Sequence, residues 1–229
     1  MPGHLGDGIE SSLPSRNFAW VAMQTTASFK ITVCGIEEPT QHCEARVSHV
    51  VSILDPAWPV PSALHTYREH ERLELRFDDV IERVPGKVPP GPQHIRQLLA
   101  LGRRLLGEPA ATRHLLIHCG AGFSRSPAAV ALMLARAVPA IAPGDIAAEV
   151  LRLRPTAWPN LRVIELGDRL LDRRGELVEA ASRIYRHRLA HQPELAVPDL
   201  RERDLDTCRS QLEAGAEQLA PEAGERVRA

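Results

Sequence analysis

The sequence predicts an α/β domain in which a central, mostly parallel sheet is flanked by helices and followed by a helical C-terminal half. In the first half of the chain, segments typical of strands alternate with segments of helical spacing, which favours parallel strands. From residue 126 to about residue 190, helical spacing continues alone. The 229 residues, 44% of them hydrophobic, suffice for one such domain with appendages.

Composition divides the chain into three parts. Residues 1–28 carry Gly, Pro and Ser without periodicity, so we expect a weakly ordered N-terminal arm. Residues 29–190 hold the predicted domain. Residues 191–229 mix Pro, Ala, Arg and an excess of acids, which predicts an acidic tail that is partly helical or disordered.

Four segments of the domain have strand patterns. Residues 29–34 read as a strand that ends before Gly35, and residues 47–54 are rich in β-branched side chains, which is typical of a strand buried on both faces. Residues 72–77 alternate polar and apolar side chains, and residues 114–118 form a short apolar run. Between the second and third strands, the proline-rich residues 56–70 are expected to be a loop.

The remaining periodic segments have the spacing of amphipathic helices. A short helix is expected over residues 37–45 and a longer one over residues 94–106. Beyond the last strand, the predicted helices cover residues 126–138, 145–153, 161–172 and 176–190.

Charge and aromatic content exclude some partners. The chain has 28 basic and 29 acidic residues and only 4% aromatic residues, so it offers neither a polycationic surface nor base-stacking platforms for nucleic acid. The most apolar helical stretch, residues 128–137, is too short to span a bilayer. We therefore expect no nucleic-acid partner and no membrane partner.

Cysteine usage indicates a reducing compartment. The four cysteines are scattered, unlike those of a small secreted disulfide scaffold, and no basic and apolar leader opens the chain. No Cys-x-x-Cys pair is present, which argues against a structural zinc site. We expect a cytoplasmic protein without a metal or other cofactor.

The segment most informative about chemistry follows the last predicted strand. Small residues, including Gly120 and Gly122, come after Cys119, and Ser126-Pro127 then opens a helix. A strand, a glycine loop and a helix N-terminus together form an anion site, because backbone N–H groups and the helix dipole attract a phosphate.

The residue types in this segment predict nucleophilic chemistry on a bound phosphate. The surroundings are expected to lower the pKa of the Cys119 thiol, whose thiolate then attacks phosphorus. Arg125 can grip two phosphate oxygens, and the Ser126 hydroxyl can help the sulfur leave. The expected phosphate-binding residues are Gly120, Ala121, Gly122, Phe123, Ser124 and Arg125.

The pattern His-Cys-x-x-Gly-x-x-Arg-Ser at residues 118–126 resembles the signature of cysteine-dependent protein tyrosine phosphatases, particularly their compact dual-specificity-like branch. Residues 152–160, which end in Pro-Asn before an apolar helix, resemble a second segment of that branch. The likeness spans roughly residues 29–190. It implies the protein tyrosine phosphatase fold, a metal-free phosphocysteine mechanism, and a supporting role for His118 in orienting the loop and setting the thiol pKa.

Expulsion of a phenolate also needs a proton donor. In the family this acid follows the third strand, where the present chain has Asp78 and Asp79. The C-terminal ends of parallel strands border one crevice, so either side chain can reach the loop. Asp79 is preferred, then Asp78, and Asp55 at the end of another strand is the third candidate. The Trp-Pro-Asp form of the family's acid loop is absent.

Three further residues have alternative interpretations. Asn160 is expected to cap the following helix, with a role near the site as the alternative. Cys34 and Cys43 are expected to be structural, although either is a candidate for a protective disulfide with Cys119.

The leading hypothesis is a phosphatase of phosphotyrosine in proteins or peptides, with phosphoserine and phosphothreonine left open as further substrates. The alternatives are a phosphatase of non-protein esters such as phosphoinositides or RNA 5′ ends, a rhodanese-type sulfurtransferase, and a phosphotyrosine-binding module without turnover. The loop between Cys119 and Arg125 contains no lysine, which disfavours a polyphosphorylated headgroup. Oligomeric state has no signal in the sequence.

Overall fold

The computed structural model describes residues 29–42, 46–67, 69–109 and 113–192. The predicted N-terminal arm, Cys43 and the predicted tail beyond residue 192 therefore lie outside the described residues. The elements follow one another as β1 (Lys30–Cys34), η1 (Pro39–His42), β2 (His49–Leu54), η2 (Ser62–Thr66), β3 (Glu71–Arg76), α1 (Pro92–Gly107), β4 (His114–His118), α2 (Arg125–Ala137), α3 (Pro143–Leu153), α4 (Leu161–Leu170) and α5 (Glu176–His191), where η denotes a 3₁₀ helix.

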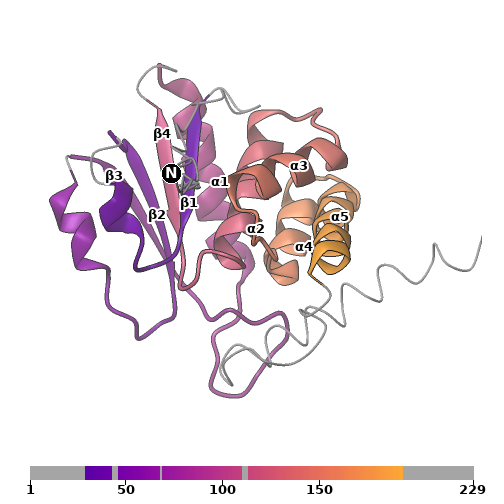
Figure 1. The fold of residues 1–229 in the computed structure, drawn as a ribbon, viewed down its shortest axis with the longest axis horizontal. Coiled ribbons are helices and arrows are strands. Elements are labelled where there is room, and N and C mark those ends of the chain that lie inside the picture. The colour runs from indigo at the N-terminus through magenta and orange to yellow at the C-terminus, as the bar shows by residue number, and fades with distance from the viewer. Residues whose placement is uncertain (1–28, 43–45, 68, 110–112, 193–229) are drawn as a thin grey trace, which may run out of the picture.

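The four strands form one parallel sheet in the order β1-β4-β2-β3 (Figure 1). The last residue of β4, His118, pairs with Cys34 on one side and with Ser52 on the other. The C-terminal ends of three strands therefore meet at one edge of the sheet, where β4 delivers Cys119. The predicted α/β class with a parallel sheet and a helical C-terminal half is confirmed.

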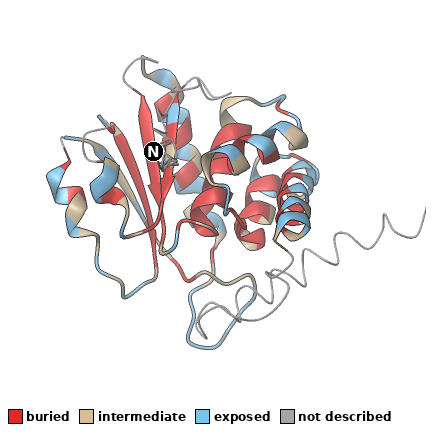
Figure 2. Ribbon diagram, viewed as in Figure 1, coloured by how far each residue is buried: buried red, intermediate tan, exposed pale blue. Residues whose placement is uncertain are grey.

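The two faces of the sheet are covered differently. Helices α1 to α5 pack on one face, and alternate strand residues such as Ile53 and Ile117 join their apolar side chains in the main core. On the other face, η1 and η2 cover a smaller cluster that includes Val50 and Leu116. In Figure 2 the sheet is largely buried, while the outer sides of the helices are exposed. None of the helices described is long and apolar enough to cross a membrane.

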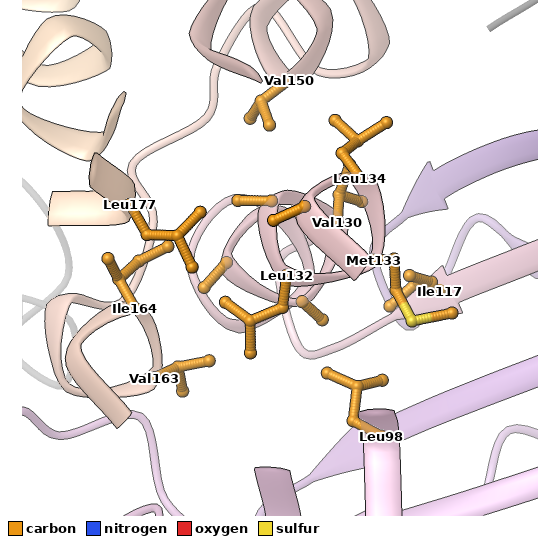
Figure 3. Packing of buried hydrophobic residues seen from close by; sticks show 14 of the residues in the cluster. Leu98, Ile117, Val130, Leu132, Met133, Leu134, Val150, Val163, Ile164 and Leu177 are labelled. Carbon is orange, nitrogen blue, oxygen red and sulfur yellow. The ribbon is translucent and has the colours of Figure 1, made fainter. Parts of the chain in front are cut away.

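Helix α2 lies at the centre of the helical layer. Every residue from its start through Ala135 is buried, which is the pattern of a helix surrounded by other elements. Figure 3 shows Leu132 directed toward Val163 of α4, while Met133 lies toward Ile117 of the sheet. Helix α4 approaches closely at Gly167, where an added Cβ would lie 2.4 Å from the Leu132 side chain. The helix after the glycine loop is thus held from several sides.

Two loop regions differ from the sequence expectation. Within the described part of the helix predicted over residues 37–45, residues 37–42 form only the 3₁₀ turn η1. Pro39 has no N–H to donate, and Gln41 N–H donates to the Glu38 carbonyl, 3.0 Å away. The predicted loop over residues 56–70 contains the turn η2, in which Leu64 N–H donates to the carbonyl of Pro61.

Candidate active site

The strand, glycine loop and helix predicted around Cys119 are all present. β4 ends at His118, and α2 begins at Arg125, so the six residues from Cys119 to Ser124 connect them. We call residues 119–125 the signature loop. Cys119 is buried, with 1% of its surface exposed, and Arg125 is 4% exposed. The loop lies at the C-terminal edge of the sheet, beside the ends of β1 and β2.

Gly122 fixes the path of the signature loop. Its φ of 74° lies in the left-handed region, and a Cβ added there would stand 2.6 Å from backbone atoms of Cys34 and Gly35. The loop is further tied to this segment by the Ile36 N–H, which donates to the Gly120 carbonyl over 2.8 Å. Any side chain at position 122 would therefore force the signature loop away from the end of β1.

The amides of the signature loop are free to bind an anion. Within the described part of the chain, the N–H groups from Gly120 to Phe123 donate to no protein acceptor. Backbone donors in such a closely packed loop normally find a partner. Consecutive unpaired amides next to the N-terminus of α2 are the arrangement that a tetrahedral anion can satisfy.

The Arg125 guanidinium is held between two acidic side chains. Its Nη1 donates to the Phe77 carbonyl over 2.7 Å and lies 2.6 Å from Asp55 Oδ1, while its Nε lies 3.6 Å from Asp79 Oδ2. A Cβ added to Gly120 would stand 3.5 Å from Nη2, so this edge of the guanidinium borders the residue after Cys119.

The electrostatic surroundings keep Arg125 charged. Burial acts to lower its pKa, but the charges of Asp79, Cys119 and Asp55 and the hydrogen bond to Asp55 outweigh burial and raise the pKa. The cation thus stays fixed at the signature loop. Asp55, the third candidate in the sequence, lies closer to Arg125 than the preferred Asp79 does, at 2.6 Å against 3.6 Å.

Asp79 is bound to the signature loop by several donors. Its Oδ1 accepts hydrogen bonds from the Ser124 hydroxyl over 2.8 Å and from the Asn160 amide over 2.7 Å. Its Oδ2 is the oxygen that lies toward Arg125. Two neutral donors on one oxygen fix the carboxyl group and leave the other oxygen for proton transfer.

Asp78 has a different environment from its neighbour. Its Oδ2 accepts a hydrogen bond from Val88 N–H over 2.7 Å, and Lys87 Nζ lies 3.2 Å from its Oδ1. These contacts close the loop between residues 78 and 88. The structure thus places Asp79 and Asp55 beside Arg125, whereas Asp78 binds Val88 and Lys87 within this loop.

The segment before α4 supports the signature loop from the other side. Trp158 N–H donates to the Phe123 carbonyl over 2.6 Å, and Asn160 N–H donates to the Ser124 carbonyl over 3.2 Å. The predicted cap is confirmed, because Asn160 Oδ1 accepts a hydrogen bond from Val163 N–H over 3.0 Å. The same side chain caps α4 with its oxygen and binds Asp79 with its nitrogen.

His118 and Ser126 flank the signature loop and are both fully buried. His118 Nε2 lies 2.7 Å from Ser52 Oγ in the neighbouring strand. Burial, assisted by Arg72 and Arg125, lowers the pKa of His118 to about 4, so the imidazole is neutral at pH 7. The Ser126 hydroxyl makes no hydrogen bond with any described residue, and its role toward the sulfur stays a prediction.

The neutral state of His118 predicts a pH dependence of stability. The unfolded chain binds a proton near pH 6.5 and the folded chain only near pH 4, so stability is expected to fall as the pH decreases between these values. The full effect is about 3 kcal/mol. The free energy of unfolding, measured with urea from pH 7.5 to pH 4.5, should depend less on pH in His118→Gln than in the control His187→Gln, which changes an exposed histidine. Equal pH dependence in both variants would show that His118 is not its cause.

Cys34 occupies the opposite side of the sheet from Cys119. Its side chain belongs to the cluster under η1 and η2, whereas Cys119 belongs to the main core. Burial, together with the charges of Glu38 and Cys119, raises the pKa of the Cys34 thiol to about 12. Cys34 therefore stays a protonated, buried thiol, in keeping with the structural role expected from the sequence.

Two contributions to the site had no local sequence signal. Arg154 forms a bidentate pair with Glu38 over 2.9 and 3.0 Å and also donates to the Ala121 carbonyl over 3.0 Å. The Trp58 ring lies 3.3 Å from the position that a Cβ on Gly120 would take. Both depend on contacts between distant segments, so only the fold reveals them.

No family model and no curated protein sequence matches the chain. Solved structures similar to it include human DUSP28, at 16% identity and a TM-score of 0.47 over 62% of this chain and 92% of that one. The Yvh1 phosphatase domain from Chaetomium thermophilum has 18% identity and a TM-score of 0.45 over 66% and 94% of the two chains. PTPMT1 in complex with PI(5)P has 13% identity and a TM-score of 0.46 over 63% and 91%.

All three structures are less than 20% identical to the chain and have TM-scores below 0.5.

Proposed function

We propose that the chain is a phosphoric monoester hydrolase that cleaves phosphotyrosine through a phosphocysteine intermediate on Cys119. The observation that carries this proposal is the signature loop, in which a cysteine is followed by unpaired amides and by a buried arginine paired with two carboxylates. Amides and guanidinium together can bind a phosphate dianion and stabilise the charge of its transition state.

In the first step, the Cys119 thiolate attacks phosphorus opposite the leaving oxygen. The S–P bond forms as the P–O bond to the phenol breaks. Asp79 donates its proton to the departing phenolate, because its Oδ1 is held by Ser124 and Asn160 while Oδ2 lies on the side of Arg125. The products of this step are the free phenol and phosphocysteine.

In the second step, a water molecule attacks the phosphocysteine. The Asp79 carboxylate accepts a proton from this water, the P–O bond forms, and the S–P bond breaks to return the thiolate. The buried Ser126 hydroxyl, which has no partner among the described residues, is available to donate a hydrogen bond to the departing sulfur. No metal ion is required at the signature loop for either step.

Two features favour an aromatic phosphoester over a polyphosphorylated lipid headgroup. The Trp58 ring beside Gly120 offers an aromatic surface next to the nucleophile. The chain from Cys119 to Arg125 contains no lysine that would add positive charge for further phosphates. Phosphoinositides are the second candidate class of substrate, because the signature loop binds only the phosphate group, which phosphotyrosine and phosphoinositides both carry.

The function is tested by comparing initial rates on matched phosphotyrosine and phosphothreonine peptides and on a short-chain phosphoinositide. The expected result is the highest kcat/KM on phosphotyrosine. Turnover of the phosphoinositide alone would replace the proposed substrate class, and retention of phosphopeptide without release of phosphate would indicate a binding module. Transfer of sulfur from thiosulfate to cyanide would identify a sulfurtransferase.

A further inference from the structure

A second cluster of polar side chains lies at the edge of the sheet opposite the signature loop. His49 begins β2, Glu71 begins β3 and Glu108 directly follows α1, so three separate segments contribute one side chain each. His49 Nε2 lies 3.5 Å from Glu71 Oε2 and 3.1 Å from Glu108 Oε1. All three atoms lie within 4.8 Å of one another. We call these residues the His49 cluster.

The imidazole at the centre of the His49 cluster is buried and held at its other nitrogen. His49 is 3% exposed, and its Nδ1 lies 2.9 Å from Ser48 Oγ. The Ser48 hydroxyl also accepts a hydrogen bond from His114 N–H over 2.9 Å and can donate its proton to the His114 carbonyl over 3.2 Å. In the tautomer in which Ser48 Oγ accepts a hydrogen bond from Nδ1–H, Nε2 presents a lone pair to both carboxylates.

Nε2 of His49 faces one carboxylate oxygen of Glu71 and one of Glu108, and a cation placed between the three atoms could bind all of them. We propose that the His49 cluster binds a divalent transition-metal ion, Zn²⁺ in the first place, with one imidazole nitrogen and two carboxylate oxygens as ligands. Ligands about 2.0–2.1 Å from a tetrahedral ion stand roughly 3.3–3.4 Å apart, close to the 3.1 and 3.5 Å found here. One imidazole combined with carboxylates suits Zn²⁺ or Mn²⁺ better than Mg²⁺ or Ca²⁺.

The surroundings of the cluster orient its ligands. Arg104 contacts Glu71 Oε1, the carboxylate oxygen that does not lie toward His49, and so leaves Oε2 for the ion. Ser48 holds the ring of His49 in the same way. Outer partners of this kind are typical of metal sites. The sequence alone predicts no metal, because the ligands are 22 and 37 residues apart along the chain and form no motif.

A metal ion at this place would act on stability and not on catalysis. It would join β2, β3 and the end of α1 at the sheet edge remote from Cys119. An ion that binds only the folded chain raises the unfolding temperature, and the stabilisation grows with the logarithm of the ion concentration divided by Kd. The proposal is independent of the phosphatase activity.

The test uses the full chain, treated with chelator, desalted and titrated with Zn²⁺ and with Mn²⁺ by isothermal titration calorimetry. We expect about one equivalent of Zn²⁺ to bind and the melting temperature to rise. Glu108→Gln and His49→Gln should each weaken binding by roughly 100-fold or more, since even outer-shell changes cost about 10–100-fold. The matched control is Glu74→Gln, on the same strand as Glu71 but paired with Arg72 and Arg76.

Equal Zn²⁺ affinity in wild type, Glu108→Gln and Glu74→Gln would place the ion elsewhere in the chain and overturn the proposal. The absence of any binding would also overturn it. Glu108 is partly exposed, so its variant remains informative if His49→Gln fails to fold. Turnover of an aryl phosphate by Glu108→Gln should match that of wild type, and this measurement reports on the signature loop separately.

Discussion

Cys119→Ser is expected to reduce turnover of an aryl phosphate by a factor on the order of 10⁵ or more, the scale of losing a catalytic nucleophile. A serine hydroxyl is a much weaker nucleophile than a thiolate, and Asp79 carries the proton for the leaving group in the first step, so no covalent intermediate forms. Release of the phenol under single-turnover conditions measures the effect. The amides and Arg125 are unchanged in this variant, so calorimetry should still detect binding of a phosphotyrosine peptide.

Cys34→Ser is the matched control for this substitution. Cys34 ends the neighbouring strand β1 and is as buried as Cys119. Burial is the main cause that raises the pKa of its thiol to about 12. Its thiol has no role in the proposed mechanism, so a folded Cys34→Ser variant should keep kcat within a few fold. Retained turnover in Cys119→Ser, or equal losses in both variants, would remove Cys119 from the nucleophilic role.

The parts of the site that the sequence predicted are those that depend on local structure. An apolar run, small residues and a Ser-Pro helix start lie within about a dozen residues, so β4, the glycine loop and α2 could be placed from the sequence. Gly122 has its own physical reason, because its positive φ and its contact with Cys34 exclude a side chain. The predicted strand boundaries agree with the structure within two residues, and those of β4 coincide with it.

The parts that escaped prediction depend on which segments the fold brings together. Asp55 ranked third as the acid, because nothing in the sequence shows that the end of β2 meets Arg125, 70 residues later. Glu38 and Arg154 pair across 116 residues with no shared pattern. The sequence placed Asp79 ahead of Asp78 but gave no sign of their contacts, which differ because Asp78 binds Val88 and Lys87 whereas Asp79 binds the signature loop.

Asp79→Asn should lower kcat by roughly 10² to 10⁴ for phosphotyrosine, the usual contribution of a general acid. The amide keeps the size of the carboxyl group, and its oxygen can still accept hydrogen bonds from Ser124 and Asn160. It cannot supply the proton that the phenolate needs. The loss should therefore shrink for aryl phosphates whose leaving groups are stable as anions, and a series of leaving groups measures this dependence.

Asp55→Asn and Asp78→Asn separate proton transfer from the other functions of acidic side chains. Asp55 lies 2.6 Å from Arg125 Nη1, so Asp55→Asn should weaken phosphate binding and raise KM while leaving the response to leaving groups unchanged. Asp78 binds Val88 and Lys87, so Asp78→Asn should lower the free energy of unfolding. A strong leaving-group dependence in Asp55→Asn, and none in Asp79→Asn, would transfer the acid to the end of β2. In that case Asp55 would donate the proton, and Asp79 would be the carboxylate that stays ion-paired with Arg125.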